Sequence, residues 1–214
     1  DTPKYKAVNV HASLLPKLRG GSPLHRCIID GYSETGVTIM YMAPGMDDGD
    51  IITQKSIKIE DTDNVGTIHD KLSILGRNLL LETLPSIFNG TNGRTHQDEN
   101  EVTFAYNIKR EEEKLDFNEK AREVFNHIRG MYPFPVSYTT LNGEIIKICE
   151  SKIGTKTSGT VGEIISIYDN GIGVKCSDTE IIITKLKPSG KKEMMARDFI
   201  NGRGKDKLLG EKLC

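Results

Sequence analysis

Asn9 and His11 are polar residues in a short apolar segment, and Asp47 follows downstream in an acidic turn. Side chains alternate between the two faces of a strand, so Asn9 and His11 are expected to point the same way. An imidazole exchanges protons near pH 7, a neighbouring carboxylate fixes its tautomer, and an amide can donate to a developing oxyanion. Together these groups suit the attack of an amine on an acyl or formyl carbon. No Ser, Cys or Lys is placed as a covalent nucleophile, which favours direct transfer between two substrates.

Each of these residues also has a purely structural interpretation. Asn9 and His11 can be a strand-end pair whose polar groups are satisfied by the backbone. The acidic run at residues 47–50 can be a solvated turn, or it can form a metal site with His11 or His25, although no known ligand spacing occurs. The other histidines are expected to be ordinary helix or linker residues: His69, His127 and His96.

The apolar pattern predicts the elements that position the candidate residues. Residues 6–14 are predicted to form a buried strand that Pro16 ends, because proline cannot continue a central strand. A long helix is predicted between caps at residues 61–64 and Asn89-Gly90, and Pro85 is expected to kink or interrupt it. The other elements of the first half are a short helix at residues 23–30 and strands at residues 36–42 and 50–59.

The second half has a different pattern and is predicted to be a separate domain. Residues 91–100 are polar and contain glycine, so they are the best candidate for a linker. Short helices are expected at residues 118–129 and near 196–200. Five short strands separated by turns favour a small β-barrel or sandwich, and we expect them around residues 136–141, 144–150, 159–168, 171–176 and 180–187.

The composition is that of an ordinary soluble globular protein of 214 residues, with 36% hydrophobic and 28% charged residues. No apolar run approaches the roughly 18 residues that a membrane helix needs. Four scattered cysteines without a C-x-x-C pair favour a reducing, cytoplasmic setting. Residues 1–107 hold 10 Lys and Arg against 14 Asp and Glu, whereas residues 108–214 hold 19 against 16. The more basic second half indicates a polyanionic partner.

Several motifs of the first half occur together in one known family. Residues 9–16 read Asn-Val-His-Ala-Ser-Leu-Leu-Pro, Arg19 and Gly20 follow, and residues 46–50 read Met-Asp-Asp-Gly-Asp. This combination resembles the formyltransferases that use N10-formyltetrahydrofolate. The resemblance implies an α/β fold in which a doubly wound, Rossmann-like domain carries the catalytic residues, which match Asn9, His11 and Asp47.

The second half resembles the linker and C-terminal domain of the branch of this family that acts on methionyl-tRNA. The similarity lies in residues 102–106, 115–117, 128–135 and 186–192. It implies a small OB-like β-barrel that helps to hold initiator tRNA. The expected domains are a partial catalytic domain at residues 1–90, a linker at 91–109 and an OB-like tRNA-binding domain at 110–214.

The resemblance implies transfer of a formyl group from N10-formyltetrahydrofolate to the amino group of methionyl initiator tRNA, with no metal and no membrane. The alternatives are a non-catalytic RNA-binding module that keeps a formyltransferase-like half, and a formyltransferase with a sugar or purine-precursor acceptor. The implied folate-binding residues are Met42, Ala43, Pro44, Gly45 and Met46. The implied substrate loop consists of Ser13, Leu14, Leu15, Pro16, Arg19 and Gly20. Candidate contacts to tRNA phosphates are Lys109, Arg110, Lys185, Lys187, Lys191, Lys192, Arg203 and Lys205.

The chain also departs from the family pattern. The family has a further βαβα part ahead of the Asn-x-His strand, and this sequence starts without a Met, so we expect it to begin inside the catalytic domain. We expect the working enzyme to need that missing part. The strand at residues 6–14 would then be an exposed edge, which favours self-association. His25 stands where many relatives have Gln.

Overall fold

The computed structural model describes residues 4–214, which divide into two compact units. The first unit holds the chain up to Ile28 together with Tyr32–Ile108, and the second holds Ile29–Gly31 together with Lys109–Cys214. The chain therefore enters the second unit briefly at Ile29–Gly31 and again from Lys109 onward.

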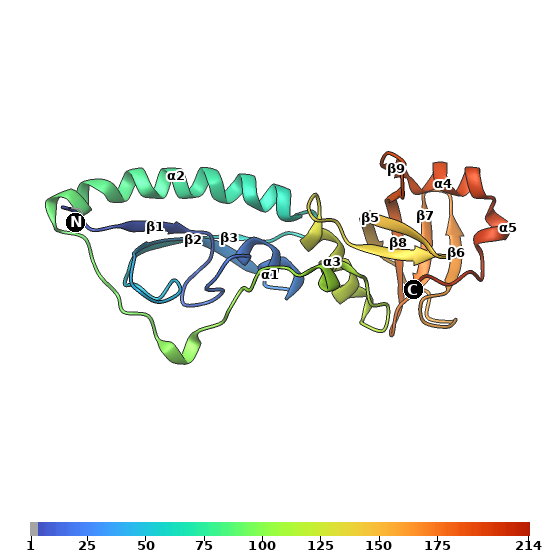
Figure 1. Cartoon of the computed structure of the whole chain (residues 1–214), viewed down its shortest axis with the longest axis horizontal. Helices are drawn as coiled ribbons and strands as arrows, with labels where there is room; N and C mark the ends of the chain where they lie inside the picture. The colour runs from blue at the N-terminus through green and yellow to red at the C-terminus, as the bar shows by residue number, and fades with distance from the viewer. Residues whose placement is uncertain (1–3) are drawn as a thin grey trace. The chain divides into compact units, whose positions relative to one another are not determined.

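The first unit is built on a three-stranded antiparallel sheet with the order β1-β2-β3. Its strands are β1 (Val8–His11), β2 (Glu34–Tyr41) and β3 (Ile51–Lys58). β2 is the middle strand, and all of its residues except Glu34 are buried, as its run of β-branched and apolar residues predicts. The long helix α2 (Val65–Asn89) runs along one face of this sheet (Figure 1), while α1 (Pro23–Ile29) follows the loop after β1.

β1 is shorter and less buried than the sequence predicted. The strand covers four residues, and among residues 4–214 it pairs with β2 alone, so it forms one edge of the sheet. Asn9 lies opposite Met40 and His11 opposite Thr38. Val10 points towards α2 but remains 41% exposed, so the expectation of a fully buried strand was wrong. The edge position is the reason, since β1 has a neighbouring strand on one side only.

Helix α2 shows how the sequence specifies its two ends. Asn64 caps the first turn by accepting a hydrogen bond from the backbone of Thr67, and Thr67 accepts one from the backbone of Asn64 in return. Gly90 ends the helix in the left-handed conformation, with φ of 69°. Pro85 does not interrupt the helix, contrary to expectation. It removes one hydrogen bond near the exposed residue Leu81, where water can replace the missing donor.

Residues 91–108, predicted as most of a linker, lie along the first unit. Thr95 and Ile51 exchange backbone hydrogen bonds, and the backbone of Ala105 donates to Arg19 and accepts from Ser22. A short 3-10 helix, η1 (Glu99–Glu101), interrupts this segment. The segment therefore contributes residues to the same unit as β1–β3.

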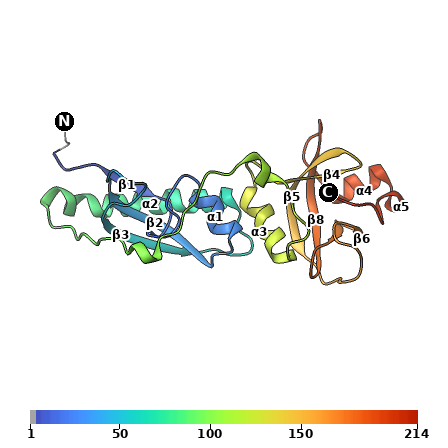
Figure 2. The same cartoon turned by 60° about the horizontal axis from the view of Figure 1, so that its bottom comes forward.

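The second unit consists of a six-stranded antiparallel sheet with short helices (Figure 2). Its main strand order is β4-β5-β8-β7-β6, and β9 pairs with β8. The five strands expected from the sequence are present as β4 (Tyr138–Leu141), β5 (Glu144–Ile153), β6 (Ile164–Tyr168), β7 (Gly171–Lys175) and β8 (Glu180–Pro188). The remaining elements are η2 (Arg110–Glu113), α3 (Ala121–Met131), β9 (Met194–Met195), α4 (Ala196–Arg203) and α5 (Lys205–Leu208).

The structure does not confirm the predicted barrel. The strand path is open, with β4 and β6 at its ends and no ladder joining them within residues 4–214. The C-terminal residues lie next to both ends: Thr140 and Cys214 exchange backbone hydrogen bonds of 2.9 and 3.1 Å, and Leu213 donates to the carbonyl oxygen of Gly162 at 2.8 Å. These contacts belong to isolated β-bridges, and the hydrophobic periodicity of the sequence does not predict such bridges.

Candidate active site

His11 ends β1 and is 6% exposed. Its Nε2 lies 3.1 Å from the carbonyl oxygen of Leu18, and its Nδ1 lies 3.6 Å from a carboxylate oxygen of Asp47. Each ring nitrogen therefore faces an oxygen atom that can accept a hydrogen bond. The Nδ1–Oδ2 distance exceeds hydrogen-bond range, which leaves the Nδ1–H able to turn to another oxygen.

Asn9 precedes His11 by two residues on the same strand and is half-buried. Its side-chain amide makes no hydrogen bond with another residue between 4 and 214, so it can donate to a bound ligand. The structure thus brings Asn9, His11 and Asp47, the three predicted catalytic residues, to one end of the β1–β2 pair.

Asp47 lies on the loop between β2 and β3 in the left-handed region, with φ of 48°. Its carboxylate oxygen accepts a hydrogen bond of 2.9 Å from the backbone nitrogen of Gly20, which ties this loop to the loop after β1. A side chain at Gly20 would collide with the carbonyl oxygen of Ala105, 2.8 Å from an ideal Cβ. The Arg19-Gly20 motif therefore allows two loops and the 91–108 segment to meet beside Asp47.

Gln97 fixes the backbone around Asp47. Its Nε2 donates to the carbonyl oxygens of Asp47 and Gly49, both at 2.8 Å, and its Oε1 accepts from Nε of Arg19 at 3.0 Å. The side chain is 2% exposed. Sequence reasoning missed this residue because a single amide in a polar, linker-like segment carries no signal of burial.

Arg19, in the predicted substrate loop, binds two other side chains of the protein. The side chain is 4% exposed, and its guanidinium donates to Glu99 at 2.9 Å as well as to Gln97. A mostly buried arginine with two protein partners is committed to holding the 91–108 segment in place. Its direct contact with substrate, implied by the resemblance, receives no support from this geometry.

The loop at residues 13–16 is held from within. Ser13 is fully buried and donates to the carbonyl oxygen of Lys17 at 2.6 Å, so its hydroxyl is not presented to substrate. Thr38 on β2 accepts from the nitrogen of Leu15 and donates to the oxygen of Ser13. Gln54 on β3 donates to the carbonyl oxygen of Leu15 at 2.8 Å. Thr38 and Gln54 are thus two further residues that position the site, and neither stood out in the sequence.

The predicted folate-binding loop, residues 42–46, lies at the surface. Met42 is 64% exposed and Met46 is 53% exposed, and the residues between them are exposed as well. Two methionine side chains beside a proline form an apolar, adaptable surface of the kind that packs against a planar ring.

Comparison with known proteins gives the family. The formyl transferase model matches residues 1–84, and the model of the formyl transferase C-terminal domain matches residues 107–204. The chain is 50% identical over 213 residues to the methionyl-tRNA formyltransferase of Staphylococcus aureus strain MW2, covering 99% of this chain and 68% of that protein. The chain belongs to the methionyl-tRNA formyltransferase family. Formyl transfer from formyltetrahydrofolate is the function of this family.

Solved structures share the formyltransferase fold. HypX from Aquifex aeolicus in complex with tetrahydrofolic acid has a TM-score of 0.70 at 17% identity, over 92% of this chain and 35% of HypX. WlaRD, a sugar 3N-formyl transferase, has a TM-score of 0.67 at 22% identity, over 86% of this chain and 66% of WlaRD. At these identities the likeness concerns the fold alone.

The basic residues predicted to contact tRNA fall into two groups. Lys185 binds the hydroxyl of Tyr132 and the carboxylates of Glu150 and Glu193, each within 3.4 Å. Burial lowers the pKa of Lys185, but these hydrogen bonds outweigh burial and raise the pKa above its ordinary value. Arg110 and Arg203 also carry carboxylate partners, Glu113 and Glu144.

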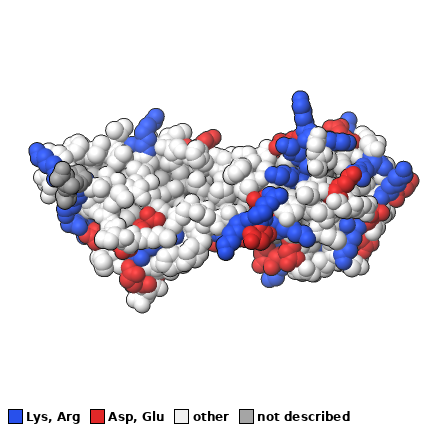
Figure 3. All heavy atoms as spheres, in the orientation of Figure 1, with Lys and Arg blue, Asp and Glu red and all other residues white. Residues whose placement is uncertain are grey.

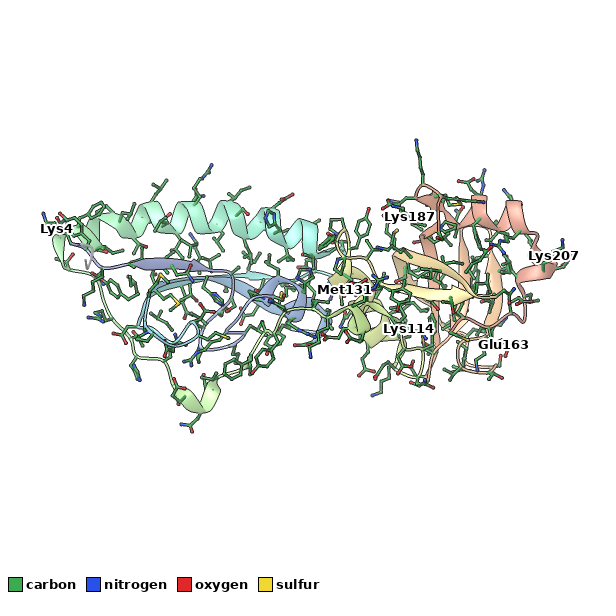
Figure 4. All side chains as sticks on the ribbon, viewed as in Figure 1. Lys4, Lys114, Met131, Glu163, Lys187 and Lys207 are labelled. Atoms are coloured by element: carbon green, nitrogen blue, oxygen red, sulfur yellow. The ribbon has the colours of Figure 1, made fainter. Side chains whose placement is uncertain are left out.

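The other group is exposed and has no ion pair within 4 Å in the described chain. It consists of Lys109, Lys187, Lys191, Lys192 and Lys205. In Figure 4 the side chain of Lys187 lies at the surface of the second unit. Figure 3 shows basic and acidic side chains interspersed on the visible face of this unit.

Residues 4–214 contain no cluster of three or more His, Cys, Asp or Glu side chains that could hold a metal ion. None of the helices there is long and apolar enough to cross a membrane.

Proposed function

We propose that this chain forms part of an enzyme that transfers the formyl group of N10-formyltetrahydrofolate to the amino group of methionyl initiator tRNA. The observation that carries the proposal is the position of His11, buried between two acceptors and two residues from an uncommitted Asn9 amide. In this proposal the imidazole of His11 and the amide of Asn9 donate together at one point, as an oxyanion requires.

In the proposed reaction the free amine of methionine attacks the formyl carbon, and a C–N bond forms. Asn9 and the Nδ1–H of His11 donate to the formyl oxygen while it carries negative charge. Asp47 accepts the proton of the attacking amine through water, and the proton passes to N10 as the bond from carbon to N10 breaks. The products are formylmethionyl-tRNA and tetrahydrofolate, so atoms and charges balance.

The folate ring is proposed to pack on residues 42–46. The exposed side chains of Met42 and Met46 fit a planar ring by their apolar and polarizable character. The loop leads directly to Asp47, whose backbone is fixed by Gln97. A ring on this loop would present its formyl group to the end of β1.

Initiator tRNA is proposed to contact the free lysines of the second unit. Lys187, Lys191 and Lys192 lie within six residues of one another on and after β8, and all three are exposed. Lys109 and Lys205 are the other candidates. Lys185, Arg110 and Arg203 are less suitable, because each already has a carboxylate partner. In this proposal the second unit corresponds to an OB-like module and the first to part of a doubly wound domain.

The open edge of β1 is proposed to pair with another strand, either from a second copy or from a segment upstream. Its exposed Val10 and unpaired backbone groups are of the type that seek such a partner. We also place the protein in the cytoplasm, since its four cysteines are free thiols.

A formyl-transfer assay with charged initiator tRNA tests the proposed function. It compares this chain with a version extended upstream of residue 1, and it offers methionyl-tRNA and an amino-sugar nucleotide as acceptors. Formylation of methionyl-tRNA by at least the extended version is the expected result. Formylation of the sugar nucleotide alone, or of neither acceptor by either version, would contradict the proposal.

A further inference from the structure

Phe104 and Tyr106 form a stacked aromatic pair at the surface of the first unit. Their ring centroids are 5.5 Å apart with an interplanar angle of 13°. Phe104 is 46% exposed and Tyr106 is 61% exposed. Two large rings that stack on each other in water still leave outer π faces available for a third ring.

The backbone that carries the rings is fixed. Ala105 between them is fully buried, and it donates to the oxygen of Arg19 at 2.7 Å and accepts from the nitrogen of Ser22 at 3.0 Å. Because side chains alternate along an extended segment, burial of Ala105 turns both neighbouring rings outward together. The pair is therefore preorganised, and a ligand that stacks on it pays little entropy to order it.

The pair lies beside the candidate active site. Gly20, whose nitrogen donates to the Asp47 carboxylate, approaches the carbonyl oxygen of Ala105, and the Met46 sulfur lies 3.4 Å from an ideal Cβ at Gly20. A cation also accompanies the rings, because Nε of Arg26 donates to the carbonyl oxygen of Tyr106 at 3.3 Å. Stacked aromatic rings can bind a base, and an adjacent guanidinium can bind a phosphate, so this arrangement suits a nucleic-acid strand.

We propose that Phe104 and Tyr106 form a stacking site for the 3′-terminal base of the acceptor tRNA. This inference rests on the proposed function, in which the attacked amine belongs to a methionine esterified to the terminal ribose. The base of that nucleotide then lies one sugar away from the reacting group, which matches a ring site next to the Asp47 loop. Stacking of this base on the rings would hold the amine at the formyl carbon, and it requires no recognition of the base sequence of the tRNA.

The chain contains no tryptophan, so Phe104→Trp introduces a single fluorescent reporter that keeps the stacked ring. We expect its emission to be quenched by initiator tRNA, and the quenching to disappear when the tRNA lacks its 3′-terminal adenosine. Quenching of the same size by tetrahydrofolate alone would overturn the proposal, since the rings would then hold the folate instead.

Binding of labelled tRNA gives the second measurement. We expect Tyr106→Ala with Phe104→Ala to raise the Kd about tenfold, in line with a base–aromatic stack of roughly 1–3 kcal/mol. Phe104→Leu tests the ring itself, because it keeps an apolar side chain without a π face. Leu81→Ala on α2, which shortens another exposed apolar side chain, is the matched control and should leave the Kd unchanged.

The two proposals fail in different ways. If the unaltered chain binds tRNA and the ring variants bind it equally well, the stacking site is refuted while the proposed function stands. If neither this chain nor its upstream-extended version binds initiator tRNA, both are refuted.

Discussion

Gln97 donates a 2.8 Å hydrogen bond to the backbone carbonyl of Asp47, 50 residues away in the sequence. The same amide nitrogen donates to Gly49, so one side chain closes the turn that presents the Asp47 carboxylate to His11. The segment that looks like a linker in the sequence thereby positions a proposed catalytic residue.

Replacing Gln97 should therefore impair catalysis more than tRNA binding. We expect Gln97→Met, which keeps the volume but not the donors, to lower kcat by roughly 10- to 100-fold, because a displaced catalytic group loses its geometry. The measurement is kcat and KM for methionyl-tRNA in the formyl-transfer assay. Asn78→Ala on the exposed side of α2 is the control, and equal kcat for Gln97→Met and the unaltered enzyme would refute this role.

The free lysines predict a salt-dependent interaction with tRNA. The double substitution Lys191→Ala and Lys192→Ala should reduce the slope of log K against log salt by about 1 to 2, since each phosphate contact contributes about 0.7 to 0.9. Lys58→Ala on the first unit, where the lysine already pairs with Glu60, serves as the matched control. Identical salt slopes for the double variant and the unaltered chain would show that these lysines do not face phosphates.

Asp63 predicts a pH dependence of stability. Burial raises the pKa of Asp63, but hydrogen bonds from Lys71, the Glu60 backbone and Thr67 outweigh burial and lower the pKa below its ordinary value. Its contribution is therefore complete above about pH 4, the ordinary pKa, and is lost as the pH falls through the lower folded pKa.

We expect Asp63→Asn to lower the free energy of unfolding by about 1–2 kcal/mol at pH 7. The difference from the unaltered chain should shrink steadily below pH 4. Urea unfolding at a series of pH values measures this, with Asp70→Asn as an exposed control on α2, the helix that follows Asp63. A difference that stays constant down to pH 2 would contradict the assignment.

The cysteines predict a marked difference in thiol reactivity. Burial raises the pKa of Cys149 and of Cys176 to about 12, and Cys27 is fully buried, whereas Cys214 is exposed. Since the thiolate is the reactive form, a thiol reagent at pH 8 should modify one cysteine quickly in the folded chain and all four after unfolding. Mass mapping identifies the modified residue, and rapid labelling of Cys149 or Cys176 in the folded chain would be the contrary outcome.

The sequence predicts this fold best where short-range rules determine it. The β-branched run of β2, the Asn64 cap and the Asn142-Gly143 turn between β4 and β5 all depend on neighbours within a few residues. The continuity of α2 through Pro85 was not predicted, because propensity alone does not show that water can replace the lost donor. The open sheet of the second unit depends on contacts between distant segments, which periodicity does not contain.

The candidate site shows the same difference between short-range patterns and contacts of distant residues. Asn9 and His11 could be paired from strand alternation, and Asp47, whose carboxylate lies 3.6 Å from Nδ1 of His11, matched the family motif. The residues that hold them were not recognisable: Gln54 reaches Leu15 across 39 residues, and Gln97 reaches Asp47 across 50. Ser13 and Arg19 were expected near substrate, yet burial commits both to the protein itself.

The most direct test of the central claim is single-turnover formylation of methionyl initiator tRNA by the upstream-extended enzyme with Asn9→Ala or His11→Ala. Each substitution removes one donor to the oxyanion, so we predict a loss of roughly 10²- to 10³-fold in rate, with tRNA affinity unchanged. A rate within a few fold of the unaltered enzyme for either variant would contradict the account.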